Sequence, residues 1–318
     1  MNTRTLGTLG SVSALTLGGG GLGQVWGATT RDEAIATVHD AIDGGITLLD
    51  MAPTYGRDSE AERVIGETFA GRLPAGIRIT TKCMLGNPPR SEVFRRLSES
   101  LDSSLERMRL DHVDVFILHG MIDASAPDGA TTRVSLDSFR ETVLPAFERI
   151  VASGRAKAWG ITGVGVPNDI LNVLEGETKP AVVQCIANVL DSAGGMHRWD
   201  GPAKSREIIA AAAANNVGVM GIRAVAAGSL TSALDRDLPA DSPESRDFER
   251  AAPFRAVANE LGLSPAFLAH QYALSMPGVS TVVLGVKNRE ELRECLAAEA
   301  AGPLDAEIAE RLSTLAKQ

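Results

Sequence analysis

Three polar residues of different chemical type each follow a short apolar or β-branched run in the sequence. These residues are Asp50, Lys82 and His119, and Tyr55 lies shortly beyond Asp50. If the runs are parallel strands of one closed sheet, their carboxyl ends meet at one rim, and the four side chains lie close together there.

A carboxylate, an ammonium, an imidazole and a phenol together are suited to proton transfer at an oxygen atom. A phenol has a pKa of about 10, and a lysine beside it favours the phenolate and lowers that pKa. A carboxylate positions the lysine, and an imidazole orients a substrate carbonyl. Because no protein side chain donates hydride, reduction at the carbon implies a nicotinamide cofactor. Taken alone, the Asp50 and Lys82 pair is equally consistent with a structural ion pair.

The elements that must position these residues alternate along the chain. Apolar, β-rich runs are separated by helical patterns, as in strands buried on both faces of a parallel sheet. Eight strands each followed by a helix predict a single-domain (β/α)8 barrel over residues 1–318. The alternative is a doubly wound open sheet. The predicted strands are Val12–Leu17, Ile46–Leu49, Ile77–Thr81, Val113–Leu118, Ala156–Ile161, Ala181–Ile186, Val217–Ile222 and Ser280–Leu284.

Local signals indicate where the helices begin. Thr30 with Glu33 forms a capping-box pattern, and Ser264-Pro265 pairs an N-cap with proline at the first helical position. The predicted last helix spans 305–316. The glycines between 18 and 23 lead into a loop, which argues against a dinucleotide fingerprint that opens a helix. Two long connections, 121–136 and 228–246, are predicted to be mobile loops at the active-site rim.

The composition excludes several functional classes. The formal net charge is −9, whereas nucleic-acid-binding proteins carry a basic surface. No apolar run reaches the roughly 20 residues that span a bilayer. Three widely spaced cysteines and an N-terminus without a cleavage pattern indicate a cytoplasmic protein. Histidine spacing predicts no metal site, and the oligomeric state is left open.

The segment from Asp50 to Gly56, with the sequence DMAPTYG, resembles the signature around the catalytic tyrosine of the aldo-keto reductase family. Further similarity to that family makes the resemblance extend over essentially the whole chain. The segments that carry it are Arg4–Gly18, Asp111–His119, Gly154–Thr162, Gln184–Asn188, Ala226–Leu230 and Val283–Gly285.

This resemblance implies a role for each of the four rim residues. Tyr55 would be the general acid in carbonyl reduction and the base in alcohol oxidation. Lys82 and Asp50 would tune it, and His119 would position the carbonyl. Gln184 would bind the nicotinamide carboxamide. The other implied cofactor-binding positions are Gly18, Gly19, Thr162, Gly163, Ile222, Arg223, Gly228, Leu230, Gly285, Lys287, Arg289, Glu291 and Cys295.

The sequence departs from the family pattern at both ends of the cofactor site. Thr162-Gly163 stands where the family usually has Ser-Asn, and Ile222 or Arg223 stands where an aromatic side chain usually stacks on the nicotinamide. Arg223 would offer its guanidinium plane or contact a phosphate.

At the adenosine end, Gly228 and Leu230 would hold the pyrophosphate, while Glu291 and Cys295 replace the family's usual polar residues. Lys287 and Arg289 would approach a 2′-phosphate, so the sequence favours NADPH. The Glu291 carboxylate opposes a phosphate, and NADH is the alternative.

The expected activity is hydride transfer between a nicotinamide cofactor and the carbonyl or alcohol carbon of a small aldehyde, ketone or sugar. Trp26 and Trp199 are candidates for the substrate wall. Two other hypotheses remain. One is an NAD-dependent alcohol or sugar dehydrogenase, and the other is a non-catalytic cofactor-sensing regulatory subunit. The substrate and the preferred reaction direction lie beyond what the sequence predicts.

Overall fold

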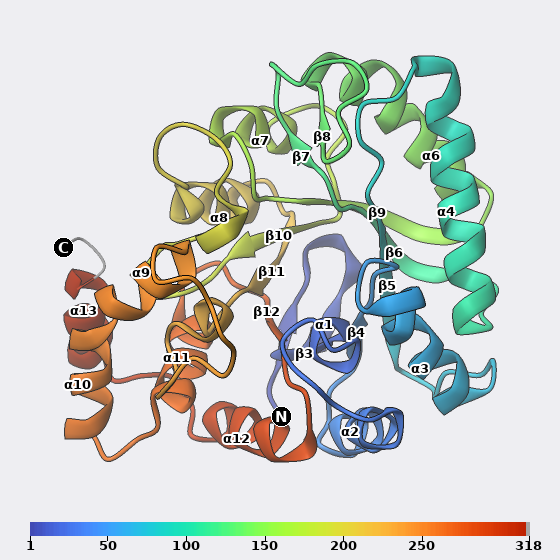
Figure 1. Cartoon of the computed structure of the whole chain (residues 1–318). Coiled ribbons are helices and arrows are strands. Elements are labelled where there is room, and N and C mark those ends of the chain that lie inside the picture. The colour runs from blue at the N-terminus through green and yellow to red at the C-terminus, as the bar shows by residue number, and fades with distance from the viewer. Residues whose placement is uncertain (316–318) are drawn as a thin grey trace.

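Eight parallel strands form a closed barrel in the computed structural model, which describes residues 1–315. In chain order the barrel strands are β3 (Leu15–Gly18), β4 (Leu48–Asp50), β5 (Arg78–Cys83), β6 (Val113–Leu118), β9 (Ala156–Thr162), β10 (Val182–Ile186), β11 (Gly218–Ile222) and β12 (Thr281–Leu284). The predicted (β/α)8 barrel is therefore confirmed. Figure 1 shows the strands at the centre with the helices around them.

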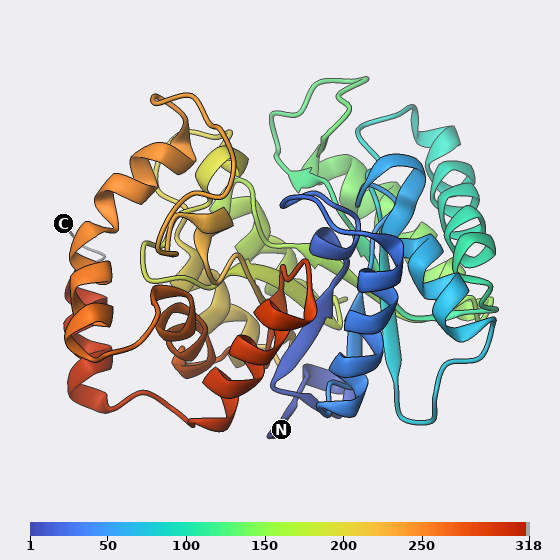
Figure 2. The same cartoon turned by 60° about the horizontal axis from the view of Figure 1, so that its bottom comes forward.

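The helices cover the outside of the barrel, where they bury the outward-facing side of each strand (Figure 2). They are α2 (Arg31–Asp43), α3 (Glu60–Phe69), α4 (Val93–Met108), α6 (Leu144–Ala152), α7 (Pro167–Leu174), α8 (Ser205–Ala214), α9 (Pro243–Arg250), α10 (Ala252–Glu260), α11 (Pro265–Ser275), α12 (Arg289–Ala300) and α13 (Ala306–Leu315). Residue 316, where the last helix was predicted to end, lies outside the described residues. No helix of the described chain is both long and apolar enough to cross a membrane.

The first predicted strand is wrong at its beginning. Ser11–Ser13 forms β2, which pairs with β1 (Thr3–Thr5) as an antiparallel hairpin, and the barrel strand begins only at Leu15. Ser13 ends the hairpin because its backbone N–H and its hydroxyl both bond to Thr47, at 2.9 and 2.8 Å. Leu6 and Val12 from this hairpin join a buried cluster with side chains of β4, β6, β10 and β11, so they fill the barrel interior.

Both predicted helix starts are capped, but only half of the predicted capping box forms, because the Glu33 carboxylate binds Arg289 and not the Thr30 backbone. The Thr30 hydroxyl accepts a hydrogen bond from the backbone N–H of Glu33 at 3.2 Å, and the Ser264 hydroxyl accepts one from Phe267 at 3.0 Å. The glycine run was predicted as loop, but it contains one helical turn, α1 (Gly19–Leu22).

The two long connections are more ordered in secondary structure than predicted. The segment 121–136 contains two short paired strands, β7 (Met121–Ile122) and β8 (Arg133–Val134). The segment predicted as loop to Arg246 already enters α9 at Pro243, where the Ser242 hydroxyl accepts from the N–H of Ser245 at 3.1 Å. Ser242-Pro243 repeats the start signal seen at Ser264-Pro265. The mobility of both segments stays a prediction.

Candidate active site

The four polar residues noted in the sequence meet at the carboxyl-terminal rim of the barrel. Asp50 is the last residue of β4, Lys82 lies in β5, and His119 directly follows β6. Tyr55 lies in the connection between β4 and α3. Because β4, β5 and β6 are hydrogen-bonded neighbours, these side chains share one side of the rim.

Lys82 is fully buried and uses each of its ammonium protons. Its Nζ donates to Oδ2 of Asp50 at 2.8 Å, to the carbonyl of Met51 at 2.9 Å and to the phenol oxygen of Tyr55 at 3.1 Å. Burial disfavours the charged ammonium, but Asp50 and Tyr55 outweigh it and raise the pKa of Lys82 above its usual value. Lys82 is therefore a fixed cation that connects the carboxylate to the phenol.

Asp50 accepts hydrogen bonds from neighbouring side chains that hold its carboxylate in place. Besides Lys82, the hydroxyl of Thr80 donates to Oδ1 at 2.6 Å and the amide of Gln184 donates to the same oxygen at 2.9 Å. A charge that is 1% exposed needs such partners. The same bond fixes the Gln184 amide, whose carbonyl oxygen is left to accept from another group.

Tyr55 and His119 face each other at the wall of a cavity. Their rings meet edge to face, with centroids 5.7 Å apart, and Nδ1 of His119 lies 3.3 Å from the Thr54 hydroxyl. Burial lowers the pKa of His119 to about 3, and Lys82 adds to this effect. The imidazole is therefore neutral near pH 7.

The pKa of Tyr55 differs in direction from the sequence-based expectation. Burial raises it, and Asp50 adds to the increase, while Lys82 opposes it without reversing it. The phenol is therefore protonated at neutral pH and can donate its proton.

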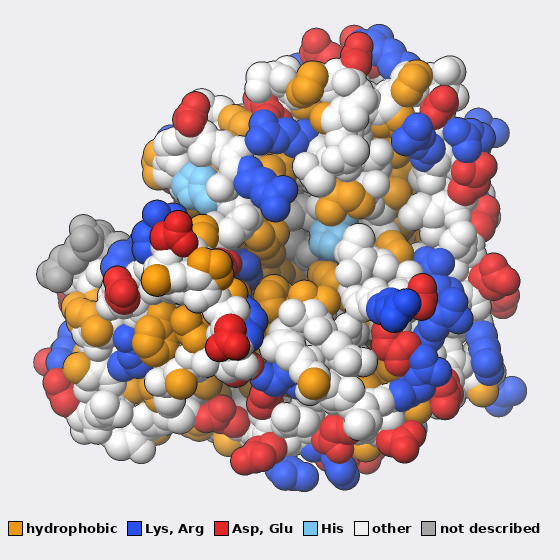
Figure 3. Space-filling model, in the orientation of Figure 1, with side chains coloured by type: hydrophobic (Ala, Val, Ile, Leu, Met, Phe, Trp, Pro, Cys, Tyr) orange, Lys and Arg blue, Asp and Glu red, His pale blue; other side chains and the backbone are white. Residues whose placement is uncertain are grey.

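The cavity above these residues has a volume of about 650 Å³, within the range of cofactor and substrate sites. It appears as the hollow near the centre of Figure 3, with apolar side chains on its floor. The predicted site residues that line it are Asp50, Tyr55, His119, Gly18, Trp26, Thr162, Gln184, Ile222, Arg223, Gly228, Gly285, Lys287, Glu291 and Cys295.

One wall of the cavity carries a polar atom that has no protein partner. The hydroxyl of Thr162, at the end of β9, is buried but unbonded. Its neighbour across the sheet is Gln184, whose amide oxygen is also left to accept a hydrogen bond. A ligand amide placed here satisfies both groups, because the hydroxyl donates to its oxygen and Gln184 accepts from its nitrogen. This pair therefore fits a nicotinamide carboxamide.

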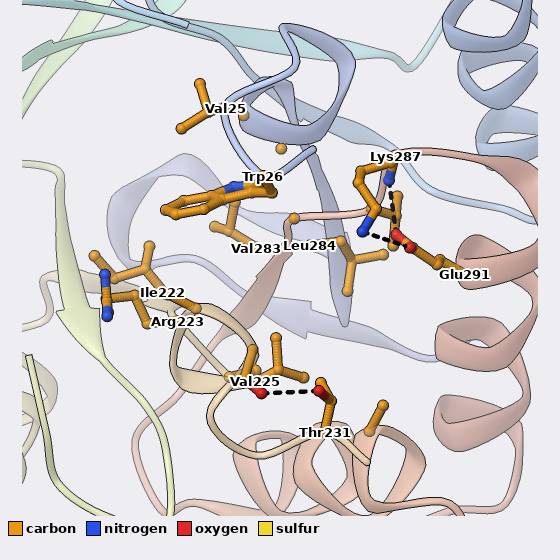
Figure 4. Close-up of a pocket in the computed structure, with 18 of the residues that line it drawn as sticks. Val25, Trp26, Ile222, Arg223, Val225, Thr231, Val283, Leu284, Lys287 and Glu291 are labelled. Carbon is orange, nitrogen blue, oxygen red and sulfur yellow. Dashed lines mark hydrogen bonds and ion pairs between the residues drawn. The ribbon is translucent and has the colours of Figure 1, made fainter. Parts of the chain in front are cut away.

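Arg223 follows β11 on the cavity wall in a left-handed backbone conformation, with φ of 59°. Its guanidinium is 7% exposed and pairs with Glu244 of α9 at 3.1 Å, while its Nε has no partner. The position predicted to contact the cofactor thus holds a buried cation on the cavity wall (Figure 4), and Glu244 fixes this cation by an ion pair.

Six of the sequence-predicted residues do not line the cavity. Lys82 lies behind Tyr55, Leu230 is fully buried, and Trp199 instead stacks on His197 with ring centroids 4.2 Å apart. Arg289 faces away and pairs with Glu33.

The remaining two are glycines that pack where a side chain has no room. A Cβ at Gly19 would lie 3.2 Å from the Tyr55 ring, and one at Gly163 would lie 2.7 Å from Val183. Both therefore serve close packing beside the cavity and do not form its wall.

Sequence reasoning placed the connection 228–246 at the active-site rim but did not single out the charged residues in it that line the cavity. In this segment, 228–241, Asp235 forms a close ion pair with Lys287, and Arg236 places its guanidinium 5.8 Å from the Trp26 ring. Trp26, predicted as substrate wall, thus lies next to Arg236 of this crossing segment, which we call the strap. Only the position of 228–241 after the seventh barrel strand pointed to it, because charged residues in a polar loop carry no local signal.

The fold and the rim together define a class of protein: a (β/α)8 barrel with a Lys-tethered tyrosine, a neutral histidine and an elongated cavity at its carboxyl-terminal face. Comparison with known proteins agrees. The sequence model of the Aldo/keto reductase family matches residues 14–317. The chain therefore belongs to the aldo/keto reductase family, whose members are oxidoreductases that use nicotinamide cofactors.

The individual proteins to which the chain is similar share less than a third of its residues. L-galactose dehydrogenase of Arabidopsis thaliana is 28% identical over 298 residues, covering 93% of this chain and 87% of the relative. D-threo-aldose 1-dehydrogenase of a Pseudomonas species is 26% identical over 329 residues, covering 94% of each chain. Among solved structures, the holo form of aldo-keto reductase AKR11C1 from Bacillus halodurans superposes with a TM-score of 0.76 at 22% identity, covering 99% of this chain and 96% of that one.

Proposed function

We propose that this protein transfers a hydride between a nicotinamide dinucleotide and the carbonyl or alcohol carbon of a small substrate, with Tyr55 as the general acid and base. The observation that carries the proposal is the hydrogen bond from buried Lys82 to the Tyr55 phenol, at 3.1 Å, on the wall of the cavity. The bound nicotinamide supplies or accepts the hydride, which no side chain provides.

Tyr55 moves the proton of the reaction. In reduction, its hydroxyl protonates the substrate oxygen, and the phenolate that forms lies 3.1 Å from the Lys82 ammonium, which stabilises the negative charge. Asp50 keeps that ammonium in position through its 2.8 Å contact. In oxidation, the same phenolate takes a proton from the substrate hydroxyl.

His119 orients the substrate oxygen. Because its pKa is lowered to about 3, it is a neutral hydrogen-bonding group and does not compete with Tyr55 as an acid. Its ring is in contact with Tyr55 and both side chains line the cavity, so one substrate oxygen in the cavity can contact both of them.

Thr162 and Gln184 would hold the nicotinamide carboxamide, and Gly228 and Gly285, which also line the cavity, would lie along the rest of the dinucleotide. The NADPH preference depends on Lys287 and Arg289 as phosphate-binding side chains. The contacts of Glu291 to Lys287 favour the other candidate, an NAD-linked dehydrogenase.

We further propose a sugar or related hydroxylated carbonyl compound as the substrate class. Two relatives that align over most of this chain carry the names L-galactose dehydrogenase and D-threo-aldose 1-dehydrogenase. A cavity that combines Trp26 with the polar groups of Thr54 and His119 suits such a molecule, because sugars present both apolar C–H faces and hydroxyls.

A spectrophotometric screen tests the proposal. Purified protein is incubated with NADH or NADPH and with aldehydes, ketones and aldoses, and nicotinamide absorbance is followed in both directions. We expect turnover with at least one carbonyl compound. Cofactor binding without any turnover would instead support the hypothesis of a non-catalytic cofactor-sensing regulatory subunit.

A further inference from the structure

The end of the cavity near the start of α12 holds a lysine that is already neutralised. Lys287 Nζ forms a close ion pair with Asp235 of the strap and a second one with Oε1 of Glu291 at 3.1 Å. The other oxygen of Glu291 accepts the backbone N–H of Lys287 at 2.8 Å. Glu291 thus holds Lys287 by both its side chain and its backbone, as Figure 4 shows.

The second basic residue of this region is also paired. Arg289 donates through Nη2 to one oxygen of Glu33 at 3.0 Å and through Nε to the other at 3.2 Å. The backbone N–H of Arg289 bonds to Glu33 at 3.0 Å, and that of Glu291 bonds to the Asn288 side chain at 2.9 Å. These N–H groups at the helix start, which elsewhere receive phosphate, are therefore occupied.

The charges that face this end of the cavity are mainly negative. Two cations, Arg236 and Lys287, face three carboxylates, those of Asp235, Glu291 and Glu294. Arg236 also pairs with Asp235 at 3.3 Å. A phosphate dianion placed here meets carboxylates whose cations are already in use, and like charges repel.

We propose that this end of the cavity selects NAD(H) over NADP(H), with Asp235 and Glu291 as the specificity-determining residues. A ribose 2′-hydroxyl can donate a hydrogen bond to either carboxylate, whereas a 2′-phosphate cannot. The inference rests on the proposed function, because it requires a nicotinamide dinucleotide in the cavity. It reverses the NADPH preference, which assumes that Lys287 and Arg289 are free.

The test uses fragments that lack the nicotinamide and therefore need no catalysis. Binding of ADP-ribose and of its 2′-phosphorylated analogue to the full chain is measured by calorimetry. We expect the wild-type protein to bind ADP-ribose at least tenfold more tightly. Asp235→Asn and Glu291→Gln should each reduce this ratio severalfold, because each leaves Lys287 less neutralised. The Asp235 side chain is 42% exposed, so its substitution spares the fold.

Glu290→Gln is the matched control, since Glu290 lies in the same helical turn but is exposed and does not line the cavity. It should leave the ratio unchanged. Equal or tighter binding of the phosphorylated analogue, or no effect of Asp235→Asn and Glu291→Gln, overturns the selectivity alone. If the wild-type protein binds neither fragment, the dinucleotide site is absent, and the proposed function fails together with the inference.

Discussion

Tyr55→Phe separates the proton-transfer chemistry from every other property of the site. Phenylalanine keeps the ring that packs edge to face on His119 and removes only the hydroxyl. A positioned general acid contributes about 10² to 10⁴ in rate, so kcat should fall by that factor, or about 3–5 kcal/mol in activation free energy. The Kd for the cofactor should change less than threefold, because the cofactor-binding positions on the β9, β10 and β12 side remain intact.

The cost to folding is smaller and can be worked from the contacts of Lys82. The substitution removes one of the three acceptors of its ammonium, while Asp50 and Met51 remain. Losing a hydrogen bond to a buried charge costs about 1.5–3 kcal/mol, which urea unfolding can resolve. The protein should therefore fold, and its inactivity will not reflect unfolding.

Tyr272→Phe is the matched control for this experiment. Tyr272 is the other tyrosine of the sequence and lies on α11, away from the cavity wall. Its hydroxyl accepts a hydrogen bond from Arg206 at 2.8 Å. The control should lose a similar amount of stability and keep wild-type turnover. Turnover is followed by nicotinamide absorbance, and cofactor binding is followed by fluorescence quenching. If Tyr55→Phe retains turnover within tenfold of the wild type, Tyr55 is not the proton donor and the reasoning is refuted.

Three further perturbations probe other parts of the site. Lys82→Met leaves the Asp50 carboxylate buried without a cation and should lower the free energy of unfolding by about 3–5 kcal/mol; urea unfolding would show no such loss if Asp50 did not depend on Lys82. His119 titrates near pH 6.5 when unfolded and near 3 when folded, so only the unfolded chain gains a proton there between pH 7.5 and 5. This acidification should lower the free energy of unfolding of the wild type by about 2 kcal/mol. His119→Phe should not show this loss, whereas His112→Gln, at an exposed histidine, should still show it. Thr162→Val removes a hydroxyl that has no protein partner, so it should leave unfolding unchanged and weaken NADH binding about 5- to 20-fold in a fluorescence titration; unaltered binding would contradict its role.

The sequence predicts those features that depend on nearby residues. Apolar runs predict all eight barrel strands. The helix starts at Thr30 and Ser264 are predicted from capping side chains, each of which bonds to the backbone N–H three residues later. The order of the strands then brings Asp50, Lys82 and His119 to one rim, because parallel strands of a closed barrel end on the same side.

What the sequence does not predict depends on pairs that are distant in the chain. Arg289 was expected at a phosphate, but its partner Glu33 lies 256 residues away on α2. Lys287 was expected to approach the same phosphate, but Asp235 of the strap forms an ion pair with it. No local pattern distinguishes a free surface cation from one that a distant carboxylate has neutralised.

The two ends of the cavity follow one physical rule, in which burial and pairing determine what a charged group can still do. Lys82 was expected to lower the pKa of Tyr55, yet burial of the phenol dominates and raises it. Because all the protons of Lys82 are committed, it cannot bind a ligand itself and acts only through the phenol that it touches. Lys287 is committed in the same way to two carboxylates, so its charge no longer marks a phosphate site. A cation in the sequence is thus evidence for anion binding only when the structure leaves it unpaired.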